Sequence, residues 1–390
     1  MMFRQYLTGI AFILLAVPSS SQQTLFRHES IITQLPHLVA QAAQAYNPLS
    51  QAYLTLTKIP ERLSDKQVLT LRRSGYAAFA FEWSIRLFGL GRNEQAWLLF
   101  EQYWRKAPTS SHTRLLALLQ EKKRFHAMER VQARVGHIEP YASISAMGLG
   151  RAVDVLNRDS IRHMGFSILD EQMRANDCEH TILLLAETLS GLEQLKRLKA
   201  QYAQSVLSDV LPYCLSEPLY IGDITQCNSH ASVFIQCDIK PLVQKSAVLQ
   251  ARHLVIMTEE QGLANVYNGV MRLHHKSELE LFIHELMHFA HFEDEYPVPV
   301  SKANWLCKTQ GFKAPNLYVG KTAPSGWYQS DTCKFGLLQS YKPQYAASKM
   351  EYHEIHLSNQ YLGLWLKSLD KTLLGPSDYQ VYLNELSATR

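Results

Sequence analysis

The sequence predicts an α+β protein, in which an N-terminal all-helical domain precedes an α/β domain of strands and helices. Apolar residues recur at three- and four-residue spacing from residue 22 to about 210, which is the period of amphipathic helices. Beyond residue 210, prolines, glycines and cysteines introduce turns, and short strand-like runs appear. With 390 residues, 46% of them hydrophobic, the chain is long enough for about two domains. We expect them to span residues 22–210 and 211–390.

Charge and hydropathy exclude several classes of protein. The 39 Lys and Arg residues nearly balance the 35 Asp and Glu residues, and no concentrated basic patch stands out. A nucleic-acid partner is therefore not expected. No stretch of about 18 apolar residues is present, so we also expect no membrane span in the mature chain.

Residues 1–21 have the pattern of a secretory signal peptide. Arg4 precedes an apolar run from Tyr6 to Val17, and Pro18 and three serines follow. The run is too short to span a bilayer comfortably. We therefore expect a periplasmic or secreted protein, the alternative being a buried N-terminal helix or an uncleaved anchor.

The six cysteines agree with export. None lies in the leader, and no pair has the C-x-x-C spacing of a zinc ribbon or a thioredoxin-like motif. In an oxidising compartment they would pair. We expect Cys227–Cys237 and Cys307–Cys333 as short loop disulfides, which leaves Cys178 with Cys214.

The helical region contains one stretch with a recognisable pattern. Its predicted helices lie in Ile31–Tyr46, Gln67–Leu90, Glu94–Arg105, Thr113–Val135 and Thr181–Leu207. Over about 30 of these residues the spacing of small, aromatic and proline positions resembles a single tetratricopeptide hairpin. The positions are Ser84, Gly91, Ala96, Phe100 and Pro108. No second copy follows at a fixed period, so an irregular helical domain is the alternative to a solenoid.

The second domain begins with strands. His253–Met257 reads as a buried strand, and two short strands, 265–268 and 270–273, flank the turn dipeptide Asn268-Gly269. A helix follows from Ser277, which we expect to form a capping box with Glu280. We then expect an irregular stretch from 297 to about 347, and a last helix from about 358 that ends at Gly375-Pro376.

This helix carries the motif H-E-x-x-H. His284 and His288 are four residues apart, so on an α-helix they project side by side, as two ligands of one Zn²⁺ would. Glu285 is rotated by about 100° from them and can act on a water molecule as a general base. The other helix residues are mostly apolar, so burial of these polar groups needs a reason. The motif predicts one zinc ion per chain.

The third ligand is not determined by the motif. If the helix continued, His291 would lie about 10.5 Å further along the axis than His284 and could not share its ion. The chain must therefore turn back after His288. Asp294 and Glu295 follow in the sequence, and Glu351 and Glu354 are later carboxylates that could serve.

The spacing H-E-x-x-H-x-x-x-x-x-D, which ends at Asp294, resembles the motif of metzincin zinc peptidases with aspartate in the last place, as in snapalysin-like members. The resemblance implies that His284, His288 and Asp294 bind zinc and that Glu285 is the base. The sequence Asp294-Glu295-Tyr296 is also similar to the IgA-peptidase-like families, in which it comes one residue later.

A second metzincin feature is the Met-turn, a buried methionine below the metal with a tyrosine two residues later. Ser348-Lys349-Met350-Glu351-Tyr352 resembles it, which implies that Met350 supports the site and that Tyr352 reaches the metal or the oxyanion. The family's glycine after the second histidine is His291 here. That position needs a left-handed backbone, which histidine tolerates better than most residues.

A gluzincin is the competing interpretation of the zinc motif. There the third ligand is a glutamate on a later helix, for which Glu351 or Glu354 could serve. In that case Asp294 would not bind the metal. His353 and His356 would be surface residues or would support the ligands.

These residues predict a zinc endopeptidase that acts on a peptide or protein substrate. The resemblance implies that segment 264–268, before the active-site helix, pairs with extended substrate, although an ordinary sheet strand is equally compatible. The helical domain would bind a protein partner or substrate, or act as a removable inhibitory segment. The alternative function is a helical protein-binding module with an inactive, structural zinc domain. The intact Glu285 argues against it, because a structural site needs no base.

Overall fold

The computed structural model describes residues 33–169, 178, 180–228, 233–243, 245–372 and 378–388. The predicted signal peptide, residues 1–21, lies outside this part of the chain. Two compact units are present, Met1–Lys122 and Lys123–Arg390. In its described part the first is helical and the second contains the strands, so the predicted α+β class with an N-terminal helical region is confirmed.

The predicted boundary near residue 210 falls inside the second unit. The strand His180–Ala186 and the helix Leu189–Ala203 both precede residue 210, yet the strand lies within the larger sheet and the helix packs on it. A cut at 210 would therefore divide one hydrophobic core. The contacts place the boundary at Lys122–Lys123.

The first unit consists of short helices joined by tight turns. They span residues 33–44, α2 Gln51–Leu56, α3 Asp65–Arg73, α4 Ala77–Gly89, α5 Asn93–Tyr103 and α6 Thr109–Glu121. The stretch with tetratricopeptide-like spacing is a helical hairpin, α4 packed on α5. The Ser84 hydroxyl donates to the carbonyl oxygen of Ala96 at 2.9 Å, which requires a small residue where the two helices meet.

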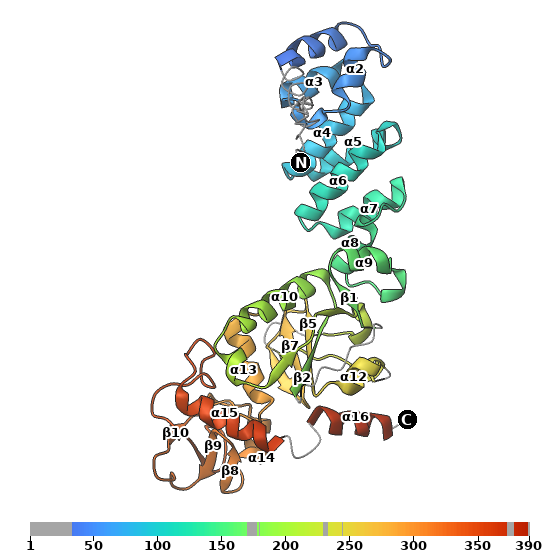
Figure 1. Cartoon of the computed structure of the whole chain (residues 1–390). Helices are drawn as coiled ribbons and strands as arrows, with labels where there is room; N and C mark the ends of the chain where they lie inside the picture. The colour runs from blue at the N-terminus through green and yellow to red at the C-terminus, as the bar shows by residue number, and fades with distance from the viewer. Residues whose placement is uncertain are drawn as a thin grey trace, which may run out of the picture. The chain divides into compact units, whose positions relative to one another are not determined.

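The second unit begins with helices and then forms its larger sheet (Figure 1). The helices are α7 Phe125–Val135, α8 Tyr141–Gly148, α9 Arg158–His163, α10 Leu189–Ala203, α11 Leu207–Val210 and α12 Ser246–Gln250. The strands are β1 Ser167–Ile168, β2 His180–Ala186, β3 Tyr213–Leu215, β4 Leu219–Tyr220, β5 His253–Thr258, β6 Asn265–Tyr267 and β7 Val270–His274. Their order is β1-β4-β2-β5-β7-β6, with β3 paired to β2, and every pair is parallel except β6 with β7.

Both faces of this sheet are covered. Helices α10 and α13 (Leu279–His288) pack together on one face. On the other face Leu254, Ile256 and Val270 form a core with residues of α12 and α16 (Asp378–Ala388). Burial on both sides explains why β5 is buried along its whole length and apolar from Leu254 to Met257. The predicted hairpin is confirmed: Asn268 and Gly269 have φ of 53° and 67°, as a tight strand–strand turn requires.

The helix predicted over Thr181–Leu207 is wrong in its first part. Residues 182–185, Ile-Leu-Leu-Leu, form the centre of β2, and Thr188 then caps α10 by accepting a hydrogen bond from the Gly191 N–H. A short run that is apolar at every position cannot be assigned by periodicity. It suits a central parallel strand, which is buried on both faces.

The stretch from 297 to 347, expected to be irregular, contains a helix and a second sheet. The helix is α14 Val300–Leu306, and the strands are β8 Gly311–Ala314, β9 Leu317–Gly320, β10 Tyr328–Ser330 and β11 Gln339–Lys342, in the antiparallel order β10-β11-β9-β8. Then α15 spans Asn359–Thr372, close to the predicted last helix, but α16 follows it. The predicted stop at Gly375-Pro376 lies outside the described residues.

All three predicted disulfides are confirmed: Cys178–Cys214, Cys227–Cys237 and Cys307–Cys333. Cys307 and Cys333 belong to the small core beneath the second sheet. Among the described helices, none combines the length and the apolar content needed to cross a membrane.

Candidate metal centre

Helix α13 carries the two histidines into the interior of the second unit. Phe282, Ile283, Leu286 and Met287 are all buried, and they anchor the helix beneath the sheet. The predicted capping box is wrong, because the N-cap residue is Glu278 and it makes no side-chain cap. The Ser277 carbonyl instead accepts a hydrogen bond from Gln194, and Glu280 pairs with Lys349. Contacts from distant segments, rather than a local cap, therefore stabilise the first turn of α13.

The chain reverses directly after α13, as the spacing of the ligands requires. His291 has φ +63°, the left-handed conformation that the sequence predicted for this position. In the same turn the Phe292 N–H donates to the carbonyl oxygen of Met287 at 3.3 Å. The reversal returns Asp294 to the face of the helix that carries His284 and His288.

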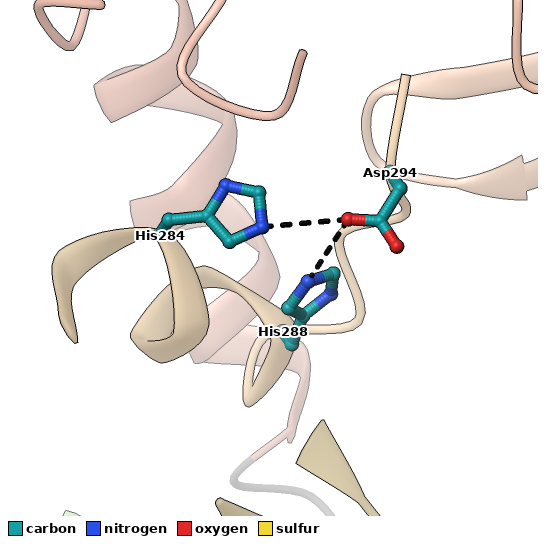
Figure 2. A group of neighbouring side chains, drawn as sticks. All are labelled: His284, His288 and Asp294. Carbon is teal, nitrogen blue, oxygen red and sulfur yellow. Dashed lines mark ion pairs between the residues drawn. The ribbon is translucent and has the colours of Figure 1, made fainter. Parts of the chain in front are cut away.

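The three side chains converge (Figure 2). Oδ1 of Asp294 lies 3.4 Å from Nε2 of His284 and 3.3 Å from Nε2 of His288. One ligand atom from each residue lies within 4.8 Å of the other two. Among the described residues, His284, His288 and Asp294 form the only group of three or more His, Cys, Asp or Glu side chains whose ligand atoms lie this close together.

Backbone carbonyls orient both imidazole rings. Nδ1 of His284 lies 2.7 Å from the carbonyl oxygen of Lys349, and Nδ1 of His288 lies 2.7 Å from that of Phe292. A carbonyl oxygen only accepts, so each Nδ1 carries the hydrogen and each Nε2 keeps its lone pair. Supports of this kind hold metal-binding histidines in the required tautomer.

The distances fit a tetrahedral ion. Donor atoms about 2.0–2.1 Å from one zinc ion lie about 3.3–3.4 Å from each other, which matches both separations from Asp294. Oδ1 of Asp294 is buried and makes no hydrogen bond of good geometry, although two nitrogens lie nearby. Donor atoms that face a common point rather than one another are typical of a metal site. Two imidazoles and a carboxylate also suit zinc.

Electrostatics couple the three groups. Burial alone would raise the pKa of Asp294, but the imidazoles of His288 and His284 outweigh it and hold that pKa well below its usual range. Burial likewise opposes charge on His288, but the carboxylate of Asp294 outweighs it and raises the pKa of His288 to about 9. The cluster therefore favours a positive charge beside Asp294.

Glu285 lies beside the cluster but outside it. The residue is 4% exposed, and Oε2 is buried without a hydrogen-bond partner among the described residues. Burial raises the pKa of this carboxyl, while the neighbouring histidines act in the opposite direction. Glu285, His288 and Asp294 all line a cavity of about 1160 Å³. A free carboxylate oxygen at the wall of a cavity can accept a proton from a bound molecule.

The segment that resembles a Met-turn lies behind His284, because Lys349 supplies the carbonyl that holds this ring. Met350 is fully buried, as expected, and its carbonyl oxygen accepts from the N–H of Glu295 at 2.9 Å. Tyr352 is placed differently. It is 57% exposed and is not among the residues that line the cavity. The turn that brings the Tyr352 N–H to the Ser348 carbonyl leaves its ring outside the site.

The other candidate carboxylates are engaged elsewhere. Glu295 is buried and accepts hydrogen bonds from Asn316, Ser348 and Tyr361. Glu351 forms an ion pair with Lys342 at 2.5 Å. The side chain of Glu354 is 72% exposed and lies beside His353. None of the three lies in the cluster, so the structure brings Asp294, and not a later glutamate, to the histidines.

Two residues of the cavity escaped the sequence analysis as site residues. Tyr296 lines the cavity, and burial together with the nearby Asp294 carboxylate raises the pKa of its hydroxyl. The sequence feature that could have identified Tyr296 as a site residue is its position two residues after Asp294. Arg272 also lines the cavity from β7. Nothing in its local sequence marks it, because its significance depends on which residues surround it.

Comparison of the chain with protein-family models, with curated proteins and with solved structures finds no match. The geometry of the site and its surroundings is therefore the basis on which a function can be proposed.

Proposed function

We propose that the chain is a zinc-dependent endopeptidase of metzincin type that acts outside the cytoplasm. The observation that carries the proposal is the convergence of His284, His288 and Asp294 beside the unpartnered Oε2 of Glu285, at the wall of a large cavity. A structural site would need the first three residues but not the fourth. Three disulfides support an oxidising compartment.

His284, His288 and Asp294 would hold the ion through Nε2, Nε2 and Oδ1. Zinc bound there would supply a Lewis acid for a peptide carbonyl and would acidify a water molecule. The Nδ1–H groups remain committed to the carbonyls of Lys349 and Phe292, so the two rings keep their orientation throughout.

Glu285 would move the proton. Oε2 has no competing hydrogen bond, so it can take a proton from the attacking water and deliver it to the nitrogen of the departing amine. Tyr296, which lies in the cavity beside Asp294, is better placed than Tyr352 to donate a hydrogen bond to the substrate carbonyl oxygen. We assign it that role.

Strand β6 would hold the substrate. It is the last strand in the order of the larger sheet, it is antiparallel to β7, and its residues line the cavity. An unpaired strand edge can bind an extended peptide through backbone hydrogen bonds. For the helical unit we keep two roles open, a binding surface for a protein partner or substrate and a removable inhibitory segment.

The test is the change Glu285→Gln, which keeps the shape of the side chain but removes its basicity. We expect a folded protein that retains its zinc and loses at least about 100-fold in kcat/KM on a mixed peptide library. Glu354→Gln is the matched control, because that carboxylate is exposed and outside the cluster. Equal cleavage by wild type and Glu285→Gln, or no cleavage by zinc-loaded wild type, would overturn the proposal.

A further inference from the structure

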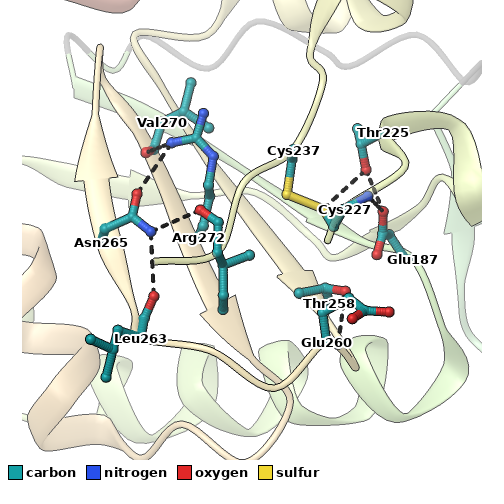
Figure 3. Close-up of a disulfide and its surroundings, with 11 residues drawn as sticks. Glu187, Thr225, Cys227, Cys237, Thr258, Glu260, Leu263, Asn265, Val270 and Arg272 are labelled. Atoms are coloured by element: carbon teal, nitrogen blue, oxygen red, sulfur yellow. Dashed lines mark hydrogen bonds between the residues drawn. A yellow bond between two sulfur atoms is a disulfide. The ribbon is translucent and has the colours of Figure 1, made fainter. Parts of the chain in front are cut away.

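A buried arginine without a carboxylate partner lines the same cavity as the histidine cluster. Arg272 is 6% exposed and belongs to β7. Nη1 donates to the carbonyl oxygen of Val270 at 3.1 Å and, more weakly, to Oδ1 of Asn265 at 3.5 Å (Figure 3). These contacts occupy one of its three nitrogens.

The other two nitrogens, Nε and Nη2, donate to no residue in the described part of the chain. In a guanidinium group Nε–H and one N–H of Nη2 are parallel, and together they form the fork from which a carboxylate accepts two hydrogen bonds. Burial lowers the pKa of Arg272, and the groups that oppose this effect are the phenols of Tyr382 and Tyr267, not a carboxylate. A buried charge without a partner is costly, so packing alone does not explain this residue.

The arginine is held in a built framework. Nδ2 of Asn265 donates to the carbonyl oxygen of Ile235 at 2.9 Å, which leaves Oδ1 of the same amide to face Arg272. Ile235 in turn donates its N–H to Leu263, and the loop that contains it is closed by the disulfide Cys227–Cys237 (Figure 3). Such support limits the movement of the guanidinium group.

The other charges of the cavity also favour an anionic ligand. Apart from the metal cluster and Glu285, the lining carboxylates already have a basic neighbour: Glu293 pairs with Lys302 at 2.5 Å, and Asp378 lies 3.4 Å from His291. Arg272 has no such partner among the described residues. A ligand that brings a carboxylate would therefore complete the charge balance of the cavity.

We propose that Arg272 binds a carboxylate of the substrate, so that the protein prefers peptides with an acidic residue, or a free C-terminal carboxylate, close to the cleaved bond. This inference rests on the proposed peptidase function and names its substrate class. Arg272 is then a specificity-determining residue, which binds the substrate in the same cavity but takes no part in the proton transfer.

The first test uses matched peptides. A single Glu is exchanged for Gln at successive positions around the cleaved bond, and a second pair compares a free with an amidated C-terminus. We expect one exchange to lower the kcat/KM of wild type about 10- to 100-fold, the range for loss of a charged hydrogen-bonded contact. The pair that responds identifies the source of the carboxylate. Equal cleavage of all pairs would overturn the inference.

The second test assigns the preference to Arg272. In Arg272→Gln the preferred peptide and its amide counterpart should differ by no more than about threefold in kcat/KM. Arg272→Lys keeps the charge without the fork and should retain part of the preference. Lys302→Gln is the matched control: it removes a positive charge from the same cavity, but one already paired with Glu293, and should keep the full preference. A preference that survives in Arg272→Gln would contradict the assignment.

A binding measurement separates this inference from the proposed function. Fluorescence anisotropy of labelled acidic and amide peptides is measured with Glu285→Gln, with and without Arg272→Gln. Acid-dependent binding that requires Arg272, when zinc-loaded wild type cleaves none of the peptides, would support the carboxylate site and reject the peptidase. Cleavage by wild type without any preference for acidic peptides would support the peptidase and reject the carboxylate site. If Arg272→Gln fails to fold, the inference is still tested by the kcat/KM ratios of the matched peptides with wild type and with Arg272→Lys.

Discussion

The Nδ1–H of His284 donates to the carbonyl oxygen of Lys349 at 2.7 Å, so a loop 65 residues further along the chain orients the first histidine of the cluster. The side chain of Lys349 fixes that loop in turn. Nζ pairs with Glu280, in the first turn of α13, and donates to the carbonyl oxygen of His353 at 2.7 Å. The helix and the loop that supports its histidine are thus tied together twice.

Removing the Lys349 side chain should loosen the site without touching a ligand. Lys349 is 2% exposed, and Lys349→Met replaces its ion pair with an apolar chain of similar length. We expect the free energy of unfolding to fall by about 1–3 kcal/mol and zinc affinity to fall about 10-fold or more. Urea unfolding and competition with a zinc-binding dye measure the two. The exposed Lys367→Met is the control, and equal effects of both changes would contradict the expectation.

The stability of the protein should depend on how readily the residue at position 291 adopts a positive φ. His291 has φ +63°, and its contact with Asp378 joins two half-exposed side chains and is worth little. His291→Gly should raise the free energy of unfolding, or leave it within about 0.5 kcal/mol, because glycine adopts this conformation freely. His291→Val should lower it by about 1–2 kcal/mol and weaken zinc binding, because β-branched residues resist it. The opposite order of the two variants would exclude a left-handed turn here.

Glu295 should be a structural residue. It is 1% exposed, and the Tyr361 hydroxyl is one of its three hydrogen-bond donors. Tyr361→Phe removes one donor from a buried carboxylate, so we expect a loss of about 1–3 kcal/mol in the free energy of unfolding with zinc content unchanged. Tyr345→Phe, at an 84% exposed site, should change it by less than about 0.5 kcal/mol. Loss of zinc in Tyr361→Phe alone would show that Glu295 supports the metal.

Acid should destabilise the second unit through His180. Burial, followed by the charge of Arg252, lowers the pKa of this ring to about 4, while Asp370 acts weakly in the other direction. The unfolded chain takes up this proton near pH 6.5, so stability is full above pH 6.5 and falls as the pH decreases towards 4. The loss is at most about 3.5 kcal/mol, at about 1.4 kcal/mol per unit of pKa shift.

Urea unfolding between pH 7 and 4 checks this expectation. His180→Phe should flatten the dependence, whereas His126→Phe, at an exposed position, should not. An unchanged slope in His180→Phe would assign the acid sensitivity to other groups. The buried His253, whose pKa is also lowered by burial, is the next candidate.

The sequence was most informative where a local pattern is sufficient. The hairpin at Asn268-Gly269, the three disulfides and the left-handed turn at His291 depend on backbone conformation or on covalent pairing, and the structure has all of them. The resemblance to the metzincin motif implied that Asp294 returns to the histidines, and the short reversal after α13 brings it within 3.4 Å of both rings.

The remaining features depend on contacts between distant segments. β2 was predicted as a helix because its apolar run has no period, and only pairing with β5 makes it a strand. The start of α13 lacks its expected cap because Lys349 holds Glu280. Tyr352 lies outside the cavity, and Tyr296 lies within it, because of how two loops fold. Arg272 is notable only for a partner that it lacks among the described residues, which no sequence pattern can reveal.

The most direct test of the account is the zinc content of the purified protein, measured by elemental analysis together with that of His284→Ala, His288→Ala and Asp294→Ala. We predict about one zinc per chain in wild type and less than about a tenth of that in each variant, with thermal unfolding followed by circular dichroism to show that the variants fold. Folded wild type that takes up no zinc, or variants that keep it, would contradict the account.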